Sequence, residues 1–169
     1  MPFSMKQGKN LIIDWLKKHK NDFSNVVDFG CGAGWYGTTI RSINPSAHLT
    51  GIEIWQPYLE KYKLAGIYDQ VIIDDARTLP FDSIDLAIFG DVLEHMEKDE
   101  AKALFEGIKA ISKYVIVSIP AVEMPQGPVF GNKFESHLAT WTWDELCEYF
   151  ADFEIREQFL QIGVFINKA

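Results

Sequence analysis

The chain has 169 residues, of which 47% are apolar and 14% aromatic, enough to fill the core of one domain. Its formal net charge of −8 repels polyanions and therefore argues against nucleic acid as a partner. No run of residues approaches the roughly 20 apolar positions that a membrane span needs, which argues against a membrane protein.

These bounds predict a single domain over residues 1–169, present in the cytoplasm as a monomer or a weak dimer. The first twenty residues alternate charged and apolar side chains, whereas a signal sequence has a continuous apolar core. Cys31 and Cys147 are too few for a disulfide framework and lack the spacing of metal ligands. We therefore expect two reduced thiols and no metal site.

In chain order, the first predicted element is an amphipathic helix over residues 4–20, because apolar residues recur at helical spacing from Leu11 to Leu16. Five strands follow, with helical patterns between most of them, which is typical of a parallel α/β sheet with right-handed crossovers. The gap before the fourth strand is too short for a full helix, so a loop or one turn should fill it. We place the five strands at residues 25–29, 48–53, 70–73, 84–89 and 114–119.

The second half of the chain predicts a helix over residues 98–112 and a long ordered loop after the fifth strand. Residues 120–134 hold three of the seven prolines, a composition that suits a loop. Thr140 or Thr142 can cap a further helix that reaches Phe150. Two apolar runs, at residues 153–159 and 162–167, then predict a closing antiparallel hairpin.

The most informative stretch covers residues 26–37. An apolar strand runs into Asp28 and then into glycines at positions 30, 32 and 34. Glycine permits positive φ angles and has no Cβ, so a ligand can lie against bare peptide groups at such a turn. Glu53 follows about twenty residues later, at the end of the next strand, where a carboxylate can accept hydrogen bonds from ribose hydroxyls. Together these residues predict a nucleoside pocket.

Four blocks, in this order and spacing, resemble the class I S-adenosylmethionine-dependent methyltransferases. They are the DFGCGAG run at 28–34, the acid within GIEI at 51–54, the pair at 75–76 and the DVLEH run at 91–95. The resemblance covers residues 25–119 densely. It implies a Rossmann-like, mostly parallel seven-stranded sheet with helices on both faces and a C-terminal antiparallel hairpin. It also implies S-adenosylmethionine as the cofactor and S-adenosylhomocysteine as the product.

By this resemblance, the cofactor would lie along the strand ends. Its methionine part would be held by Asp28, Phe29, Gly30, Cys31, Gly32 and Gly34, its ribose by Glu53, and its adenine by Ile54, Trp55, Asp75 and Ala76. Gly90 and Asp91 would face the sulfonium and the amino group. An Asp before a helical turn is also a common N-cap, so Asp91 suits that role equally well.

Residues 32–37 also match the G-x-G-x-x-G pattern of NAD-binding domains. Counted from the first glycine after the strand, Gly30, the third glycine position holds Trp35. An indole cannot replace the glycine that permits close packing of helix on strand, which favours the methyltransferase interpretation. A bare turn without a ligand is the remaining alternative, although such a turn needs no acid before it and none after the next strand.

Methyl transfer from a sulfonium is an in-line displacement, so positioning matters most and a base is needed only if the acceptor must lose a proton early. His95 and His137 are the candidate catalytic residues, and each could instead be a packed or hydrogen-bonded structural histidine. We expect a small-molecule or other soluble acceptor with an oxygen or nitrogen nucleophile. The alternative is a non-catalytic, S-adenosylmethionine-binding regulatory or partner subunit.

Overall fold

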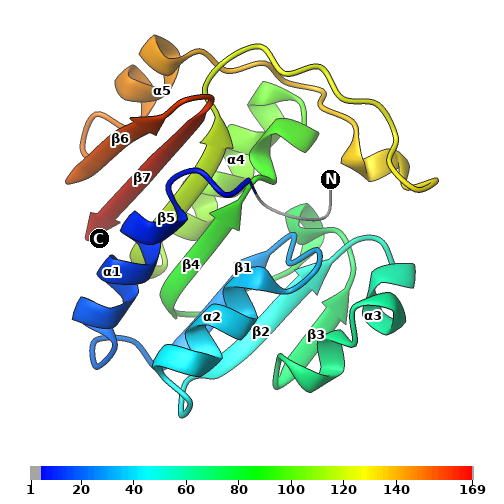
Figure 1. Ribbon diagram of the computed structural model, residues 1–169, viewed down its shortest axis with the longest axis vertical. Helices are drawn as coiled ribbons and strands as arrows, with labels where there is room; N and C mark the ends of the chain where they lie inside the picture. Colours follow the sequence, from blue (N-terminus) through cyan, green and yellow to red (C-terminus); the bar gives the residue numbers. More distant parts are fainter. Residues whose placement is uncertain (1–4, 169) are drawn as a thin grey trace.

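The computed structural model describes residues 5–168 and contains one seven-stranded sheet in the order β3-β2-β1-β4-β5-β7-β6 (Figure 1). The five strands from β3 to β5 are parallel, and β7 runs antiparallel to both β5 and β6. This arrangement confirms the predicted sheet and its closing hairpin. The strands are β1 Asn25–Phe29, β2 His48–Glu53, β3 Gln70–Ile73, β4 Ile84–Gly90, β5 Ser112–Pro120, β6 Ile155–Phe159 and β7 Ile162–Lys168.

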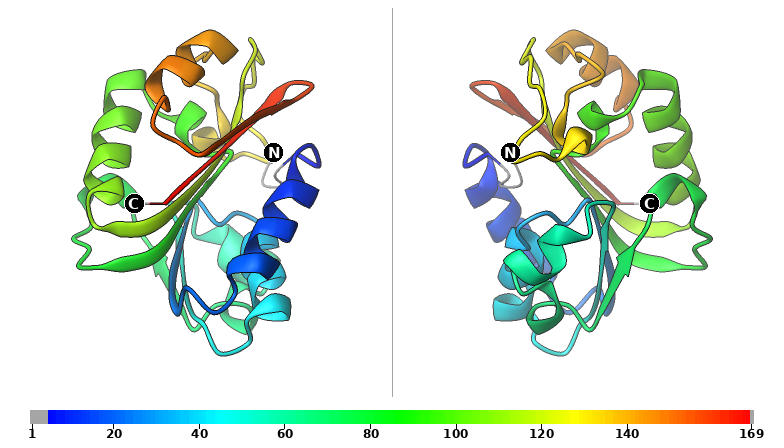
Figure 2. Two further views of the ribbon diagram at one scale, coloured as in Figure 1. Left: turned by 90° about the vertical axis from the view of Figure 1, so that its left-hand side faces the viewer. Right: turned by 90° about the vertical axis from the view of Figure 1, so that its right-hand side faces the viewer.

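Helices cover both faces of the sheet (Figure 2). One apolar core lies under α1 Lys9–His19, α2 Trp35–Ile43 and α3 Pro57–Lys61, and a second lies under α4 Lys98–Lys109 and α5 Trp143–Tyr149. Along β1 the side chains alternate between these cores, with Val26 in the first and Val27 and Phe29 in the second. Asp28 therefore points toward the face that carries α2.

Most predicted boundaries agree with the structure to within a few residues. The first helix begins at Lys9, after Gly8 at a φ of 75°, and the start predicted for it at Ser4 lies outside the described residues. Helix α4 ends at Lys109 because the chain enters β5 at Ser112, whose hydroxyl donates to the Ile108 carbonyl at 2.7 Å. The connection before β4 contains a single 3-10 turn, Ala76–Thr78, as predicted. Among residues 5–168, no helix is long and apolar enough to cross a bilayer.

The long loop after β5 forms a strap, which we define as residues 121–142. In Figure 1 this yellow segment leaves the end of β5 and crosses to the side of the sheet that carries α3. It includes a 3-10 turn, Lys133–Glu135, and is tied to α3 by the Tyr58 hydroxyl, which donates to Glu135 Oε1 at 2.9 Å. Thr142 then caps α5 in a reciprocal pair with Glu145, which identifies it as the cap between the two predicted threonines.

Candidate active site

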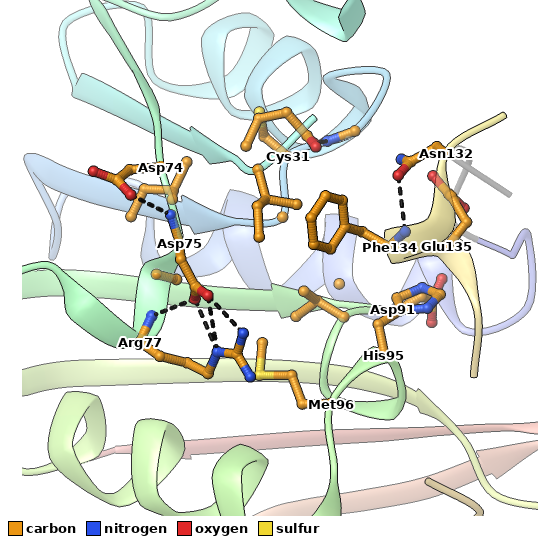
Figure 3. A pocket seen from close by; sticks show the side chains of 18 of the residues that line it. Cys31, Asp74, Asp75, Arg77, Asp91, His95, Met96, Asn132, Phe134 and Glu135 are labelled. Carbon is orange, nitrogen blue, oxygen red and sulfur yellow. Dashed lines mark hydrogen bonds and ion pairs between the residues drawn. The ribbon is translucent and has the colours of Figure 1, made fainter. Parts of the chain in front are cut away.

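A cavity of about 110 Å³ opens at the carboxyl ends of β1 to β4. Ligands bind at this edge in open α/β sheets, next to the point where the strand order reverses, here between β1 and β4. The strap closes the outer side, and the Phe134 ring points into the cavity (Figure 3). The predicted site residues that line it are Gly30, Cys31, Gly32, Glu53, Ile54, Asp75, Ala76, Gly90, Asp91 and His95.

Glu53 is the central polar group of the cavity wall. Its side chain is 5% exposed, and its two carboxylate oxygens accept the backbone N–H groups of Gly32 at 3.0 Å and Trp55 at 2.8 Å. Burial raises the pKa of Glu53 to about 7, against the lowering effect of these two N–H donors. The acid therefore fixes the glycine turn while its remaining lone pairs can accept further hydrogen bonds.

The glycine turn has the backbone conformation that its sequence predicts. Gly30, Gly32 and Gly34 have φ angles of 64°, 51° and 77°. A Cβ built on Gly30 would lie 2.5 Å from the Val92 side chain, so this position has no space for a side chain. The Cys31 N–H donates to the Ile52 carbonyl at 2.9 Å and anchors the turn to the end of β2. Bare backbone therefore faces the cavity.

Asp28 does not line the cavity, although we expected it there. It is 2% exposed and lies beneath α2, where it accepts the Tyr68 hydroxyl at 2.6 Å. The same hydroxyl accepts the Gly37 N–H at 3.3 Å, so the acid is linked to the first turn of α2. Burial raises the pKa of Asp28 to about 7. The alternation of side chains along β1 accounts for this inward position.

Three further predicted cofactor residues also lie outside the cavity wall. Phe29 is fully buried and stacks on Phe89 with ring centroids 4.6 Å apart, so its side chain belongs to the core. Gly34 is the N-cap of α2 at a positive φ and does not itself line the cavity. Trp55 contributes its N–H to Glu53, and its ring lies 6.3 Å from the Phe134 ring.

At the β3 end, the Asp75 carboxylate is already held by a guanidinium. Arg77 donates to it from Nε at 2.9 Å and from Nη2 at 2.5 Å (Figure 3). Its Nη1 also donates to Glu100 on α4 at 2.7 Å. The pKa of Asp75 is lowered, chiefly by this hydrogen bonding. Hydrogen bonding of Asp75 to the adenine edge thus stays a prediction. The neighbouring Asp74 also lines the cavity and is a second acid that could accept this hydrogen bond.

Gly90 and Asp91 occupy the β4 end of the cavity. Any side chain at Gly90 would overlap the Tyr36 ring, so only backbone can stand at that position. Asp91 has a φ of 55° and accepts hydrogen bonds from the Ser118 hydroxyl and the Met5 N–H, both at 2.9 Å. Val92, and not Asp91, is the N-cap of the following turn, so the capping interpretation of Asp91 is wrong.

The two candidate catalytic histidines lie side by side, with ring centroids 4.9 Å apart. His95 lines the main cavity, whereas His137 lines a second, smaller one that His95 also borders. Burial lowers the pKa of His95 to about 4, and it also lowers the pKa of His137. Both rings are therefore neutral near pH 7, and a neutral imidazole can accept a proton.

Several lining residues were not among the predicted site residues. They are Trp35, Tyr36, Ile52, Asp74, Arg77, Val92, Met96, Asn132, Phe134 and Glu135. Ile52 and Val92 lie within the sequence blocks, and the residues that adjoin a block could have been found by extending it by one or two positions. Asn132, Phe134 and Glu135 could not, because the loop composition predicts a strap but not which of its residues turn inward.

The comparisons with known proteins agree with this geometry. A family model described as a methyltransferase domain matches residues 26–114, more than half of the chain. The chain belongs to the methyltransferase-domain family. This match confirms the predicted class I S-adenosylmethionine-dependent methyltransferase, an enzyme with S-adenosylmethionine as its cofactor. No curated protein matches the chain.

Solved structures share the fold of this methyltransferase at low sequence identity. The methyltransferase domain of a bacterial Hen1, CtHen1-CN, is 18% identical with a TM-score of 0.71, and the match covers 95% of this chain and 96% of that one. Magnesium protoporphyrin IX methyltransferase from Synechocystis PCC 6803, solved with bound S-adenosylhomocysteine (SAH), is 15% identical with a TM-score of 0.69 over 93% and 80% of the two chains. The N-terminal domain of EvdMO1, in the presence of SAH and D-fucose, is 13% identical with a TM-score of 0.70 over 98% and 84%.

Proposed function

We propose that this methyltransferase transfers the methyl group of S-adenosylmethionine to an oxygen or nitrogen of a small-molecule or other soluble acceptor, and that the strap forms the acceptor side of the cavity. The observation that supports it most directly is the cavity itself. It joins a glycine turn, a buried acid at the β2 end and a loop-built outer wall at the edge of the sheet where ligands bind.

The lining residues fit this cofactor by charge and by shape. Acidic side chains face the cavity, among them Glu53, Asp74, Asp75 and Asp91, whereas Arg77 is the one lining residue in the described part of the chain with a permanent positive charge. The sulfonium and the ammonium of the cofactor are both cations, so an acidic wall attracts them. Ile54, Met96 and Phe134 supply apolar surface for an adenine ring. There is no space for a side chain at Gly30, so a ligand would contact bare backbone at this position.

In the proposed reaction, bound S-adenosylmethionine supplies an electrophilic methyl group on sulfur. Glu53 would hold the ribose hydroxyls, and the methionine part would lie against the bare backbone of the turn from Gly30 to Gly32. The backbone at Gly90 would face the amino group. These contacts hold the donor in a fixed pose, and such positioning is the main requirement of an in-line displacement.

The acceptor would enter between the β4 end and the strap. His95 lines the cavity there as a half-buried, neutral imidazole and can take a proton if the acceptor must lose one. His137 would act only through the second cavity or through His95, because it does not line the first. The five acidic side chains that line the cavity disfavour a polyanionic acceptor, in agreement with the negative net charge.

A calorimetric titration tests the cofactor site. SAH should bind at one site per chain and raise the melting temperature, whereas NAD should do neither. Stabilisation by NAD alone would contradict the proposal. Transfer of a labelled methyl group into fractions of a cell extract would then identify the acceptor class.

The alternative, a non-catalytic subunit that binds S-adenosylmethionine, shares the entire donor site. It is distinguished by turnover: SAH binding without methyl transfer into any fraction would favour it. A single domain, a cytoplasmic location and a monomeric or weakly dimeric state also remain part of the proposal, and sedimentation analysis of the purified chain tests the last of these.

A further inference from the structure

A second cavity, of about 60 Å³, lies between the turn after β4 and the strap. Glu94, His95 and His137 line it together. One potential ligand atom from each of these three side chains lies within 4.8 Å of the other two. Glu94 and His95 are adjacent in sequence, whereas His137 belongs to the strap and lies 42 positions after His95.

Hydrogen bonds fix the orientation of both imidazole rings. His95 Nδ1 lies 3.1 Å from the Ser136 carbonyl oxygen, and His137 Nδ1 lies 2.5 Å from the Met124 carbonyl oxygen. A carbonyl oxygen can only accept, so each Nδ1 carries the proton and donates it. Each Nε2 therefore keeps its lone pair. This is the arrangement of metal-binding histidines, whose second nitrogen donates to a backbone carbonyl or a carboxylate.

Glu94 adds a buried carboxyl group with an unsatisfied oxygen. Its side chain is 2% exposed, and no residue in the described range 5–168 donates a hydrogen bond to its Oε2. A buried polar atom without a partner is costly and is rare in folded proteins, so it calls for an explanation such as a bound ion. A cation shared with two imidazole nitrogens would compensate this oxygen directly.

We propose that Glu94, His95 and His137 bind one divalent transition-metal ion through a carboxylate oxygen and the two Nε2 atoms. Two imidazoles and one carboxylate are a ligand set that Zn²⁺, Co²⁺ and Fe²⁺ accept, whereas Mg²⁺ and Ca²⁺ prefer oxygen ligands alone. Three protein ligands leave at least one coordination position for water or for another molecule. The site replaces our sequence-based expectation of no metal, which rested on the cysteines alone.

The ion would stand beside the main cavity, because His95 lines both. A histidine that binds a metal through Nε2 cannot accept a proton there, so the metal role and the base role of His95 exclude each other. The proposal does not depend on methyl transfer, since two of the three ligands, Glu94 and His137, do not line the donor cavity. Metal binding and SAH binding can therefore be measured separately.

The test uses the full chain after removal of metal with a chelator. Zn²⁺ is titrated by calorimetry, and Co²⁺ by visible absorption. We expect one ion per chain, and a cobalt spectrum without the intense sulfur-to-metal band that a thiolate ligand gives. Fewer than about 0.1 ions per chain for Zn²⁺, Co²⁺ and Mn²⁺, or a sulfur band from Cys31 or Cys147, would overturn the proposal. These measurements need no variant.

Variants then locate the ion. His137→Gln and Glu94→Gln should each weaken Zn²⁺ binding by about 100-fold or more, beyond the 10–100-fold typical of losing a second-shell partner. The matched control is His48→Gln on β2, an exposed histidine outside the cluster, which should bind Zn²⁺ as the unaltered chain does. SAH affinity in each variant reports whether the fold is intact. Unchanged Zn²⁺ affinity in both cluster variants would place the ion elsewhere and overturn the assignment.

Discussion

Glu53 has two roles at once, because its carboxylate both holds the turn that forms the donor site and faces the ligand. Its oxygens accept the N–H groups of Gly32 and Trp55, which belong to different loops. A neutral amide of the same size can accept at only one of its two polar atoms. Replacement by Gln therefore weakens the turn and the ligand contact together, without leaving a hole in the core.

We predict that Glu53→Gln lowers SAH affinity by about 10–100-fold, which corresponds to about 1.5–3 kcal/mol for hydrogen bonds to a charged group. Calorimetry measures the loss, and circular dichroism checks the fold. Glu157→Gln, the same change at an exposed position on β6, is the control and should leave affinity unaltered. Equal affinities in the two variants would show that Glu53 does not contact the ligand.

Glu53 and Asp28 show which site positions could be predicted from the sequence. Spacing after the glycine turn was enough to single out Glu53, and the structure puts it in the cavity wall. The same reasoning placed Asp28 there as well, yet its side chain lies under α2. Whether Asp28 faces the first or the second apolar core depends on how β1 lies between them. The residues on both sides of Asp28 are apolar, so their pattern does not indicate which face of the strand Asp28 takes.

Identical substitutions at two glycines, one at the end of a strand and one in a helix, should have opposite effects on stability. Gly90 at the end of β4 leaves no space for a Cβ, because the Tyr36 ring occupies it. Gly107, near the end of α4, is exposed and has no heavy atom within 4 Å of a built Cβ. Packing decides the first case and helix propensity decides the second.

We therefore predict that Gly107→Ala stabilises the protein by about 0.5–1 kcal/mol, since alanine loses less backbone entropy in a helix. Gly90→Ala should destabilise it by about 1–3 kcal/mol, the range for overpacking, and should displace the Tyr36 ring toward the cavity. Urea unfolding measures the change in the free energy of unfolding for each variant. A stabilised Gly90→Ala variant with unchanged SAH affinity would contradict the packing described for the β4 end.

The strap depends on a contact that no local pattern predicts. Tyr58 on α3 and Glu135 on the strap are 77 residues apart, and their hydrogen bond is buried. The prolines in residues 120–134 predict a loop and its surface course. Its docking onto α3 follows from the sheet order, which brings β3 and the segment before it to the edge opposite β6. Topology, and not composition, therefore completes the outer wall of the cavity.

Removal of the Tyr58 hydroxyl should loosen the strap. We predict that Tyr58→Phe costs about 1–2 kcal/mol of stability and speeds the release of SAH several-fold, because it takes away a buried hydrogen bond to a carboxylate. Stopped-flow displacement measures the release rate. Tyr114→Phe is the matched change at the opposite, amino-terminal end of β5, and it should leave release unaltered. The same rate in all three proteins would mean that the strap does not retain the ligand.

Buried acids make the stability of the whole protein depend on pH. Asp28 is fully enclosed, and around it lie the Tyr68 hydroxyl, the nearby Glu53 carboxyl and the Lys9 ammonium. Burial raises the pKa of Asp28 from 3.8 to about 7. Between these two values the folded state holds a proton that the unfolded state has lost, so the Asp28 contribution to stability falls as pH rises. His95, with its pKa lowered to about 4, acts in the opposite direction, so the net profile of the protein mixes both signs.

A difference between two proteins isolates the Asp28 contribution. Asn at position 28 can still accept the Tyr68 hydroxyl but has no proton to lose, so we predict that Asp28→Asn becomes more stable relative to the unaltered chain as pH rises from 5 to 7. The gain should be about 2–3 kcal/mol, at 1.36 kcal/mol for each pKa unit, and should level off above pH 7. Urea unfolding at several pH values measures it. Asp152→Asn is the control, because the Lys109 ion pair lowers the pKa of Asp152 and its effect should stay constant over this range. A flat difference for Asp28→Asn would mean that Asp28 is ionised throughout, held by Tyr68 and Lys9 despite its burial.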